Sequence, residues 1–131
     1  MPSILLIEDD DPYREALADA LTEHGYAVTQ AADGAQGVKL FRAAPTDLVI
    51  TDIVMPNKEG TATIEELRRD YPDLGIIAMS GGTARNPALY LQIADLLGAN
   101  HTLNKPFTLP TLLQAVGEVL ANGGSDKLRG V

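Results

Sequence analysis

Three short runs of apolar residues without polar alternation constrain the fold of this chain most. They are residues 4–7 (ILLI), 48–50 (LVI) and 76–79 (IIAM). An uninterrupted run of this length is typical of a strand covered on both faces, as in a parallel sheet. Two weaker runs, 26–28 (YAV) and 101–103 (HTL), leave open whether those segments are strands or loops.

Segments with helical spacing separate these runs. The first is expected to have Asp11 as its N-cap and Pro12 in its first turn, and to end at Gly25. Its apolar face has residues at i, i+3, i+4, i+7 and i+8: Tyr13, Ala16, Leu17, Ala20 and Leu21.

Four further helices are predicted over about 35–43, 61–70, 86–98 and 109–120, with Thr63 and Glu66 spaced as a capping box. Five strands alternating with five helices predict an α/β domain with a doubly wound parallel sheet between two helical layers. The 131 residues suit one domain. It is expected to span 1–121, with a flexible, glycine-rich tail over 122–131.

Polar residues follow the apolar runs at positions that a parallel sheet brings to one edge. Glu8 and Asp9 follow the run at 4–7, and Asp52 follows shortly after the run at 48–50. Ser80 follows the run at 76–79, and Lys105 comes shortly after the run at 101–103. Open parallel sheets bind ligands beyond the carboxyl ends of their strands, where the strand order reverses. We therefore expect these carboxylates, the hydroxyl and the ammonium group to converge there.

The chemistry of this set favours a hard cation and a phosphoryl group. The chain has no cysteine, and oxygen ligands favour Mg²⁺, which Asp9, Asp52 and a backbone carbonyl could hold. Glu8 would act through a bound water or hold its neighbours. Lys105 can pair with Asp52 and then with a phosphoryl group on it, to which Ser80 can donate. Asp52 is then a credible nucleophile toward phosphorus.

Taken together, these residues resemble the receiver domain of two-component response regulators over about residues 3–120. The matching motifs are the acidic pair at 8–9, D-x-x-M-P at 52–56 followed by Gly60, the hydroxyl of Ser80, and K-P-F at 105–107. The resemblance implies a flavodoxin-like strand order of 2-1-3-4-5. It also allows a cis peptide bond between Lys105 and Pro106.

The resemblance further implies a role for each residue of the set. Asp52 would accept a phosphoryl group from a sensor histidine kinase, a histidine phosphotransfer protein or a small phosphodonor. Lys105 and Ser80 would contact that group. The Mg²⁺ ligands would be Glu8, Asp9, Asp52 and the backbone carbonyl of Val54.

The chain departs from the family pattern where the signal is read out. Thr102 stands three residues before the lysine, where the family usually has an aromatic switch residue. Near 86–98, Tyr90 and Ala94 flank Leu91 on an apolar face that we expect to contact a partner protein or a second copy. The core-facing stripe is expected to consist of Leu89, Ile93, Leu96 and Leu97.

Charge and termini bear on partners and location. Eighteen acidic and ten basic residues give a net charge of −8, which argues against direct binding of nucleic acid. The first ten residues lack a basic leader, and their apolar run is too short for a signal peptide or a membrane span. We expect a cytoplasmic protein, and the start at Met1 and the short tail favour a stand-alone regulator over a receiver within a larger chain.

Three other functions fit part of the pattern. A degenerate receiver would act only as a protein-interaction module, but all five key positions are intact. An aspartyl-phosphate phosphohydrolase needs a second acid two residues after the nucleophile, where Val54 stands. A flavin or nucleotide carrier needs a phosphate-cradling loop where residues 8–11 would repel phosphate. The expected protein is therefore no enzyme in the usual sense, because it promotes only its own phosphorylation and dephosphorylation.

Overall fold

The computed structural model describes residues 1–53, 60–81 and 87–122. The strands are β1 (Ser3–Ile7), β2 (Ala27–Ala31), β3 (Leu48–Asp52), β4 (Gly75–Ser80) and β5 (His101–Asn104). The helices are α1 (Asp11–Glu23), α2 (Gly34–Ala43), α3 (Gly60–Asp70), α4 (Pro87–Leu96) and α5 (Leu109–Asn122). Val54, Gly82 and the tail from residue 123 lie outside the described residues, as do the side chains of Tyr90 and Leu91.

The five strands form one parallel sheet in the order β2-β1-β3-β4-β5, which confirms the predicted order. Both weak apolar runs belong to strands, and these strands are β2 and β5, the two edges. An edge strand has one neighbour and is less covered, so it needs fewer apolar residues than a central one. Accordingly, every residue of β3 and β4 is buried, whereas most of β2 is not.

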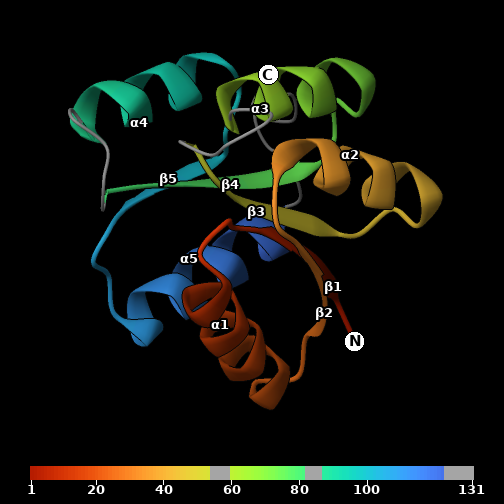
Figure 1. The fold of residues 1–131 in the computed structure, drawn as a ribbon, viewed down its shortest axis with the longest axis vertical. Helices are drawn as coiled ribbons and strands as arrows, with labels where there is room; N and C mark the ends of the chain where they lie inside the picture. Colours follow the sequence, from red (N-terminus) through yellow and green to blue (C-terminus); the bar gives the residue numbers. More distant parts are fainter. Residues whose placement is uncertain (54–59, 82–86, 123–131) are drawn as a thin grey trace.

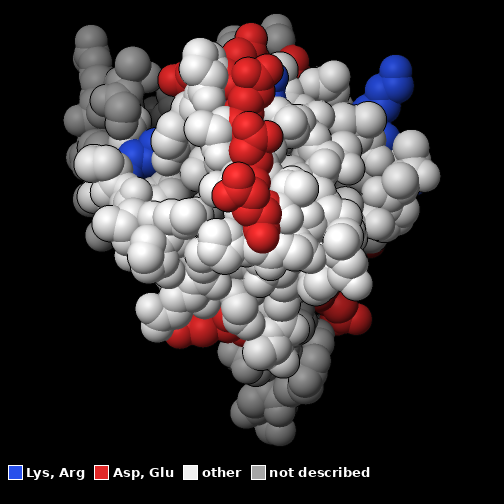
Figure 2. Space-filling model, turned by 90° about the horizontal axis from the view of Figure 1, so that it is seen from below, with Lys and Arg blue, Asp and Glu red and all other residues white. Residues whose placement is uncertain are grey.

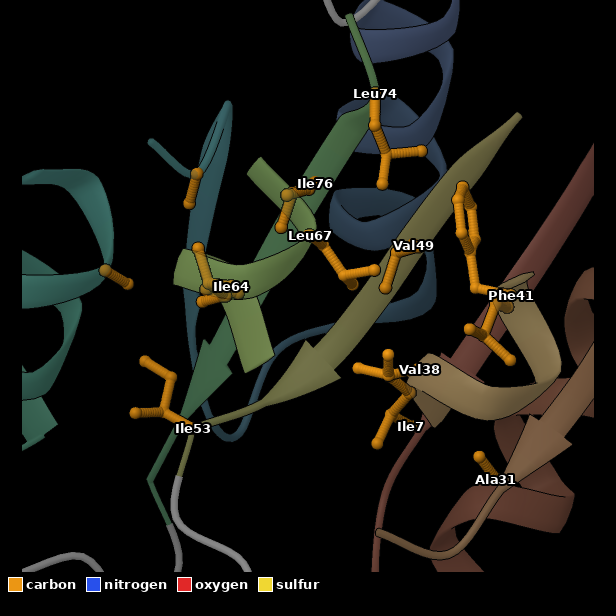
Figure 3. Close-up of a cluster of buried hydrophobic side chains, with 14 residues drawn as sticks. Ile7, Ala31, Val38, Phe41, Val49, Ile53, Ile64, Leu67, Leu74 and Ile76 are labelled. Atoms are coloured by element: carbon orange, nitrogen blue, oxygen red, sulfur yellow. The ribbon is translucent and has the colours of Figure 1, made fainter. Parts of the chain in front are cut away.

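Helices cover both faces of the sheet, as predicted (Figure 1). On one face α1 and α5 pack over a cluster that includes Leu21, Ile50 and Val116. On the other face α2, α3 and α4 pack over a second cluster. Figure 3 shows that cluster, with Val38 and Phe41 of α2 and Ile64 and Leu67 of α3 directed toward Val49 and Ile76 of the sheet.

The outer face of α1 is strongly acidic. Four exposed carboxylates recur every fourth residue along the helix: Asp11, Glu15, Asp19 and Glu23. Seen from below Figure 1, acidic side chains form a continuous line across this face (Figure 2). Like charges at i, i+4 destabilise a helix by a few tenths of a kcal/mol per pair, so this line does not serve the fold. It also makes the face unfavourable for nucleic-acid phosphates.

Three local predictions are wrong. The N-cap of α1 is Asp10, whose carboxylate accepts the Tyr13 N–H, while Asp11 is already in the helix. The buried side chains of α1 include Ala18, whereas Ala16 is exposed. Thr63 is buried inside α3, too far from the first residue, Gly60, to cap it. Asp10 and Asp11 offer the same cap chemistry, so the sequence alone did not decide between them.

The predicted orientation of α4 is also wrong. Ala94, assigned to the partner-contact face, is completely buried in the core. Leu89 and Leu96, assigned to the core, are 48% and 86% exposed. The helix is apolar on most sides, so its sequence did not define which side packs on the sheet. The small side chain of Ala94 lets the helix lie close to the sheet, and the predicted contact surface therefore cannot include Ala94.

A half-buried arginine ties together three segments at the end of the core. The Arg68 guanidinium donates to the carbonyls of Pro72 and Gly98 at 2.8 and 2.9 Å and to Asn100 Oδ1 at 2.8 Å. Asn100 Oδ1 also accepts the N–H of Ile76, at 2.9 Å. Desolvation lowers the pKa of Arg68. The side chain thus fixes the end of α3 and the turn after α4 to the start of β4.

Arg68→Met is expected to lower the free energy of unfolding by about 2 kcal/mol, because it leaves several carbonyl acceptors without a donor. Urea denaturation followed by circular dichroism measures this. The control is Arg69→Met on the same helix, where an exposed side chain pairs only with its neighbour Asp70 among the described residues. That change is expected to cost less than about 0.5 kcal/mol. Equal losses in the two variants would contradict the assignment.

Candidate functional site

The carboxyl ends of the strands bring together the residues predicted to form the site. Asp52 and Ser80 are the last residues of β3 and β4, and Glu8 directly follows β1. Carboxylate oxygens of Glu8, Asp9 and Asp52 lie within 4.8 Å of one another. Lys105 follows β5, and its backbone N–H donates to the carbonyl of Ser80 at 2.6 Å. The predicted convergence of these five residues is therefore present in the fold.

Lys105 is the cation of this cluster. Its Nζ lies 2.5 Å from Glu8 Oε1 and 3.4 Å from Asp52 Oδ2. We expected its partner to be Asp52, but Glu8 is the closer carboxylate. The Glu8 side chain is 1% exposed, and a carboxylate buried so completely requires a compensating positive charge. Glu8 therefore holds the lysine beside Asp52.

Asp52 is buried at the end of β3, and its Oδ1 accepts the N–H of Ile53 at 2.8 Å. Desolvation raises the pKa of Asp52, while the Lys105 ammonium and the Ile53 N–H oppose that rise. The pKa of Asp9 is raised as well, by desolvation and by its contacts with Glu8. The ionised cluster carries three negative charges against one positive charge, so a further cation would stabilise it.

The donor chemistry of the cluster fits a hard divalent cation. Glu8, Asp9 and Asp52 contribute carboxylate oxygens, which are the ligands that Mg²⁺ prefers. Ser80 adds a different capability: it is 1% exposed, and its Oγ has no hydrogen-bond partner among the described residues. A buried hydroxyl without a partner is costly. It is thus available to donate to a group placed beside Asp52.

The start of α1 is anchored to the same site, which the sequence did not reveal. The Asp10 N–H donates to Glu8 Oε2 at 3.1 Å, and Arg14 Nη1 donates to the Glu8 carbonyl at 2.9 Å. Asp10 was not among the predicted site residues. Asp10 lies three residues before Tyr13, and this spacing could have indicated that it caps the helix. Asp11 offered an equally good cap, so the spacing did not decide between them.

The segment after β5 matches the expectation from K-P-F, because the peptide bond between Lys105 and Pro106 is cis. Thr102 lies in β5, paired in register with Ala78 and partly buried. Val54, the predicted carbonyl ligand, lies outside the described residues. In the parts of the chain that the structure describes, no helix is long and apolar enough to cross a membrane.

Comparison with known proteins gives a consistent match. The family model described as response regulator receiver domain matches residues 4–117. The transcriptional regulatory protein AfsQ1 of Streptomyces coelicolor is 37% identical over 94% of this chain and 53% of its own length. The probable chemotaxis protein CheY of Rhizobium etli is 36% identical over 88% of this chain and 90% of its own. The chain thus spans about half of AfsQ1 but most of CheY.

Solved structures agree with this match. A response regulator receiver domain protein from Clostridium thermocellum superposes with a TM-score of 0.86 at 25% identity, covering 93% of this chain and 96% of that one. The response regulator TrrA from Thermotoga maritima, in complex with Mg²⁺ and BeF, gives a TM-score of 0.81 at 29% identity, covering 91% of this chain and 99% of that one. The doubly wound fold is therefore shared with proteins of known structure.

Proposed function

The chain belongs to the response regulator receiver family of two-component systems, and from that membership we propose that Asp52 is its phosphoacceptor. One observation carries the proposal: a buried carboxylate lies beside a lysine ammonium group, two further carboxylates and a buried hydroxyl that has no hydrogen-bond partner in the described part of the chain. Each of these groups has a use in phosphoryl transfer. Receiver domains are generally signalling modules rather than enzymes.

In the proposed reaction an Asp52 carboxylate oxygen attacks the phosphorus of a phosphohistidine or of a small phosphodonor. The new O–P bond forms as the P–N bond to the histidine ring breaks. The ring nitrogen keeps the electron pair of that bond and takes up a proton from solvent. Lys105 and Ser80 stabilise the phosphoryl oxygens, the first by charge and the second by donating its hydroxyl proton.

Receiver domains bind Mg²⁺ at an acidic site, and we assign that role here to Glu8, Asp9 and Asp52, with the carbonyl of Val54 completing the set. A bound Mg²⁺ would supply the positive charge that lets an anionic phosphodonor approach these carboxylates. Glu8 has a second role, because its contact with Lys105 keeps the ammonium group within reach of Asp52.

The proposed donor is a sensor histidine kinase or a histidine phosphotransfer protein, and the proposed location of the chain is the cytoplasm. The acidic line along α1 supports a donor whose docking surface is basic. The phosphorylated form would signal by contact with a downstream protein or a second copy of the chain. The exposed Leu89 and Leu96 of α4 are candidates for that contact.

The test is incubation with acetyl phosphate and Mg²⁺, followed by intact-mass measurement and mapping of the modified residue. We expect one phosphoryl group per chain, located on Asp52, and no adduct when EDTA is present. A phosphohydrolase would release phosphate repeatedly without accumulating an adduct. A degenerate receiver, acting only as an interaction module, would remain unmodified. Either result would overturn the proposal.

A further inference from the structure

An aromatic ring lies against the lysine of the site. The Lys105 Nζ is 4.8 Å from the centroid of the Tyr13 ring, on the face of the ring. Tyr13 belongs to the first turn of α1 and is half-buried. Its ring meets Phe107 in an edge arrangement, with 6.5 Å between centroids. These side chains, with Asp10 and Pro106, line a cavity of about 310 Å³ beside the phosphoacceptor.

We propose that Tyr13 is a positioning residue for Lys105, an inference that rests on the proposed phosphorylation of Asp52. A lysine side chain has four rotatable bonds, and holding its ammonium group in one place costs conformational entropy. A ring face attracts an ammonium group and so reduces the number of positions that it visits. Tyr13 restrains Lys105 through the face of its ring, in addition to the contacts of Lys105 with Glu8 and Asp52.

A ring suits this role better than a further carboxylate would. The attraction of an ammonium group to an aromatic face does not direct an N–H at a single acceptor atom. The N–H donors of Lys105 therefore remain available to Glu8 and Asp52, and then to a phosphoryl oxygen. A carboxylate at position 13 would instead compete for those donors and add a fourth negative charge to the cluster.

The backbone that carries the Tyr13 ring is anchored at the start of α1. The backbone N–H of Tyr13 donates to the Asp10 carboxylate at 3.2 Å. Asp10 in turn donates its N–H to Glu8, the closest partner of Lys105. The start of α1, the ring and the lysine thus form one connected unit, and Phe107 supports the ring from the segment after β5.

The test compares Tyr13→Leu and Tyr13→Phe with the wild type at saturating acetyl phosphate and Mg²⁺. We expect Leu to lower the maximal phosphorylation rate about tenfold, consistent with the loss of a partly desolvated cation–π contact. Phe keeps the ring and is expected to retain the wild-type rate. Phe107→Leu removes the support of the ring and is expected to give a smaller loss.

The control is Tyr71→Leu. Tyr71 also contacts a cation, Arg42 at 5.7 Å, but it lies near the start of β4, away from the site. We expect this variant to phosphorylate at the wild-type rate. A rate loss as large as that of Tyr13→Leu would mean that rates respond to general packing, and would overturn the positioning role.

Nuclear magnetic resonance gives a second readout that does not depend on phosphorylation. The ε-methylene protons of Lys105 are expected to be shifted upfield by the ring in the wild type and in Tyr13→Phe, and to lose that shift in Tyr13→Leu. A wild type that accepts no phosphate defeats the proposed function itself. If the wild type is phosphorylated, two results would contradict the role of the ring. One is an unchanged rate in Tyr13→Leu, and the other is a rate loss in Tyr13→Phe as large as that in Tyr13→Leu.

Discussion

Asp52→Asn is expected to abolish phosphorylation by acetyl phosphate and, in the absence of divalent cations, to raise the free energy of unfolding at pH 7. The first result follows because an amide oxygen is not a competent nucleophile toward phosphorus. The second follows from burial. Asparagine has nearly the same shape and can still accept the N–H of Ile53, but it carries no charge that the interior must accommodate.

The direction of the stability change follows from the pKa of Asp52. Desolvation raises that pKa in the folded state above its value in the unfolded chain. At a pH between the unfolded-state and folded-state pKa values of Asp52, the folded state binds more protons than the unfolded state. The contribution of Asp52 to the free energy of unfolding is therefore highest at low pH and is lost as pH rises through the folded-state pKa. Ionisation of the Asp52 carboxyl in the folded state therefore lowers stability, and a neutral replacement avoids that loss. Lys105 keeps its closer contact with Glu8 in the variant.

Urea denaturation at pH 7 with EDTA, repeated at acidic pH, measures this effect. The stability gain of Asp52→Asn should shrink as the pH falls below the range in which Asp52 ionises. The matched control is Asp19→Asn on the acidic face of α1, where the carboxylate is exposed; it should alter neither phosphorylation nor the pH dependence. A phosphorylated Asp52→Asn protein, or one less stable than the wild type at pH 7, would contradict the prediction.

The fold could be predicted because the apolar runs are visible in short stretches of sequence, although the strands that they form pair with distant parts of the chain. Buried central strands must be apolar throughout, so 4–7, 48–50 and 76–79 were recognisable without any knowledge of their neighbours. Once those strands are parallel, the residues that follow them must meet at one edge. The location of Glu8, Asp52 and Ser80 was therefore a consequence of topology.

The contacts inside the site were less predictable, because they depend on side-chain geometry. Lys105 has two carboxylates within reach, and sequence spacing does not indicate that Glu8 is the nearer one. The ring of Tyr13 was interpreted as part of the apolar face of α1, although it lies against Lys105. The rotation of α4 was not encoded by hydrophobic periodicity, since leucines lie around most of that helix.

Gly60 offers the largest effect expected outside the charged residues. It is the first residue of α3, and its N–H donates to the Ile53 carbonyl at 2.6 Å. A Cβ atom at this position would lie 2.0 Å from the Asp52 carbonyl oxygen and 2.5 Å from the Ile53 Cα. Both neighbours are backbone atoms of the segment that carries the proposed phosphoacceptor, so no side-chain rotation can relieve the overlap.

Gly60→Ala is thus expected to lower the free energy of unfolding by about 3 kcal/mol or more. It should also displace Asp52 relative to Lys105, which would slow phosphorylation in the molecules that remain folded. The control is Gly117→Ala on α5, where the added methyl group meets no atom within 4 Å. Because alanine favours helix over glycine by about 1 kcal/mol, that variant should be at least as stable as the wild type. Urea denaturation measures both changes in stability. A Gly60→Ala protein with the stability and the phosphorylation rate of the wild type would contradict the close contact between α3 and the end of β3.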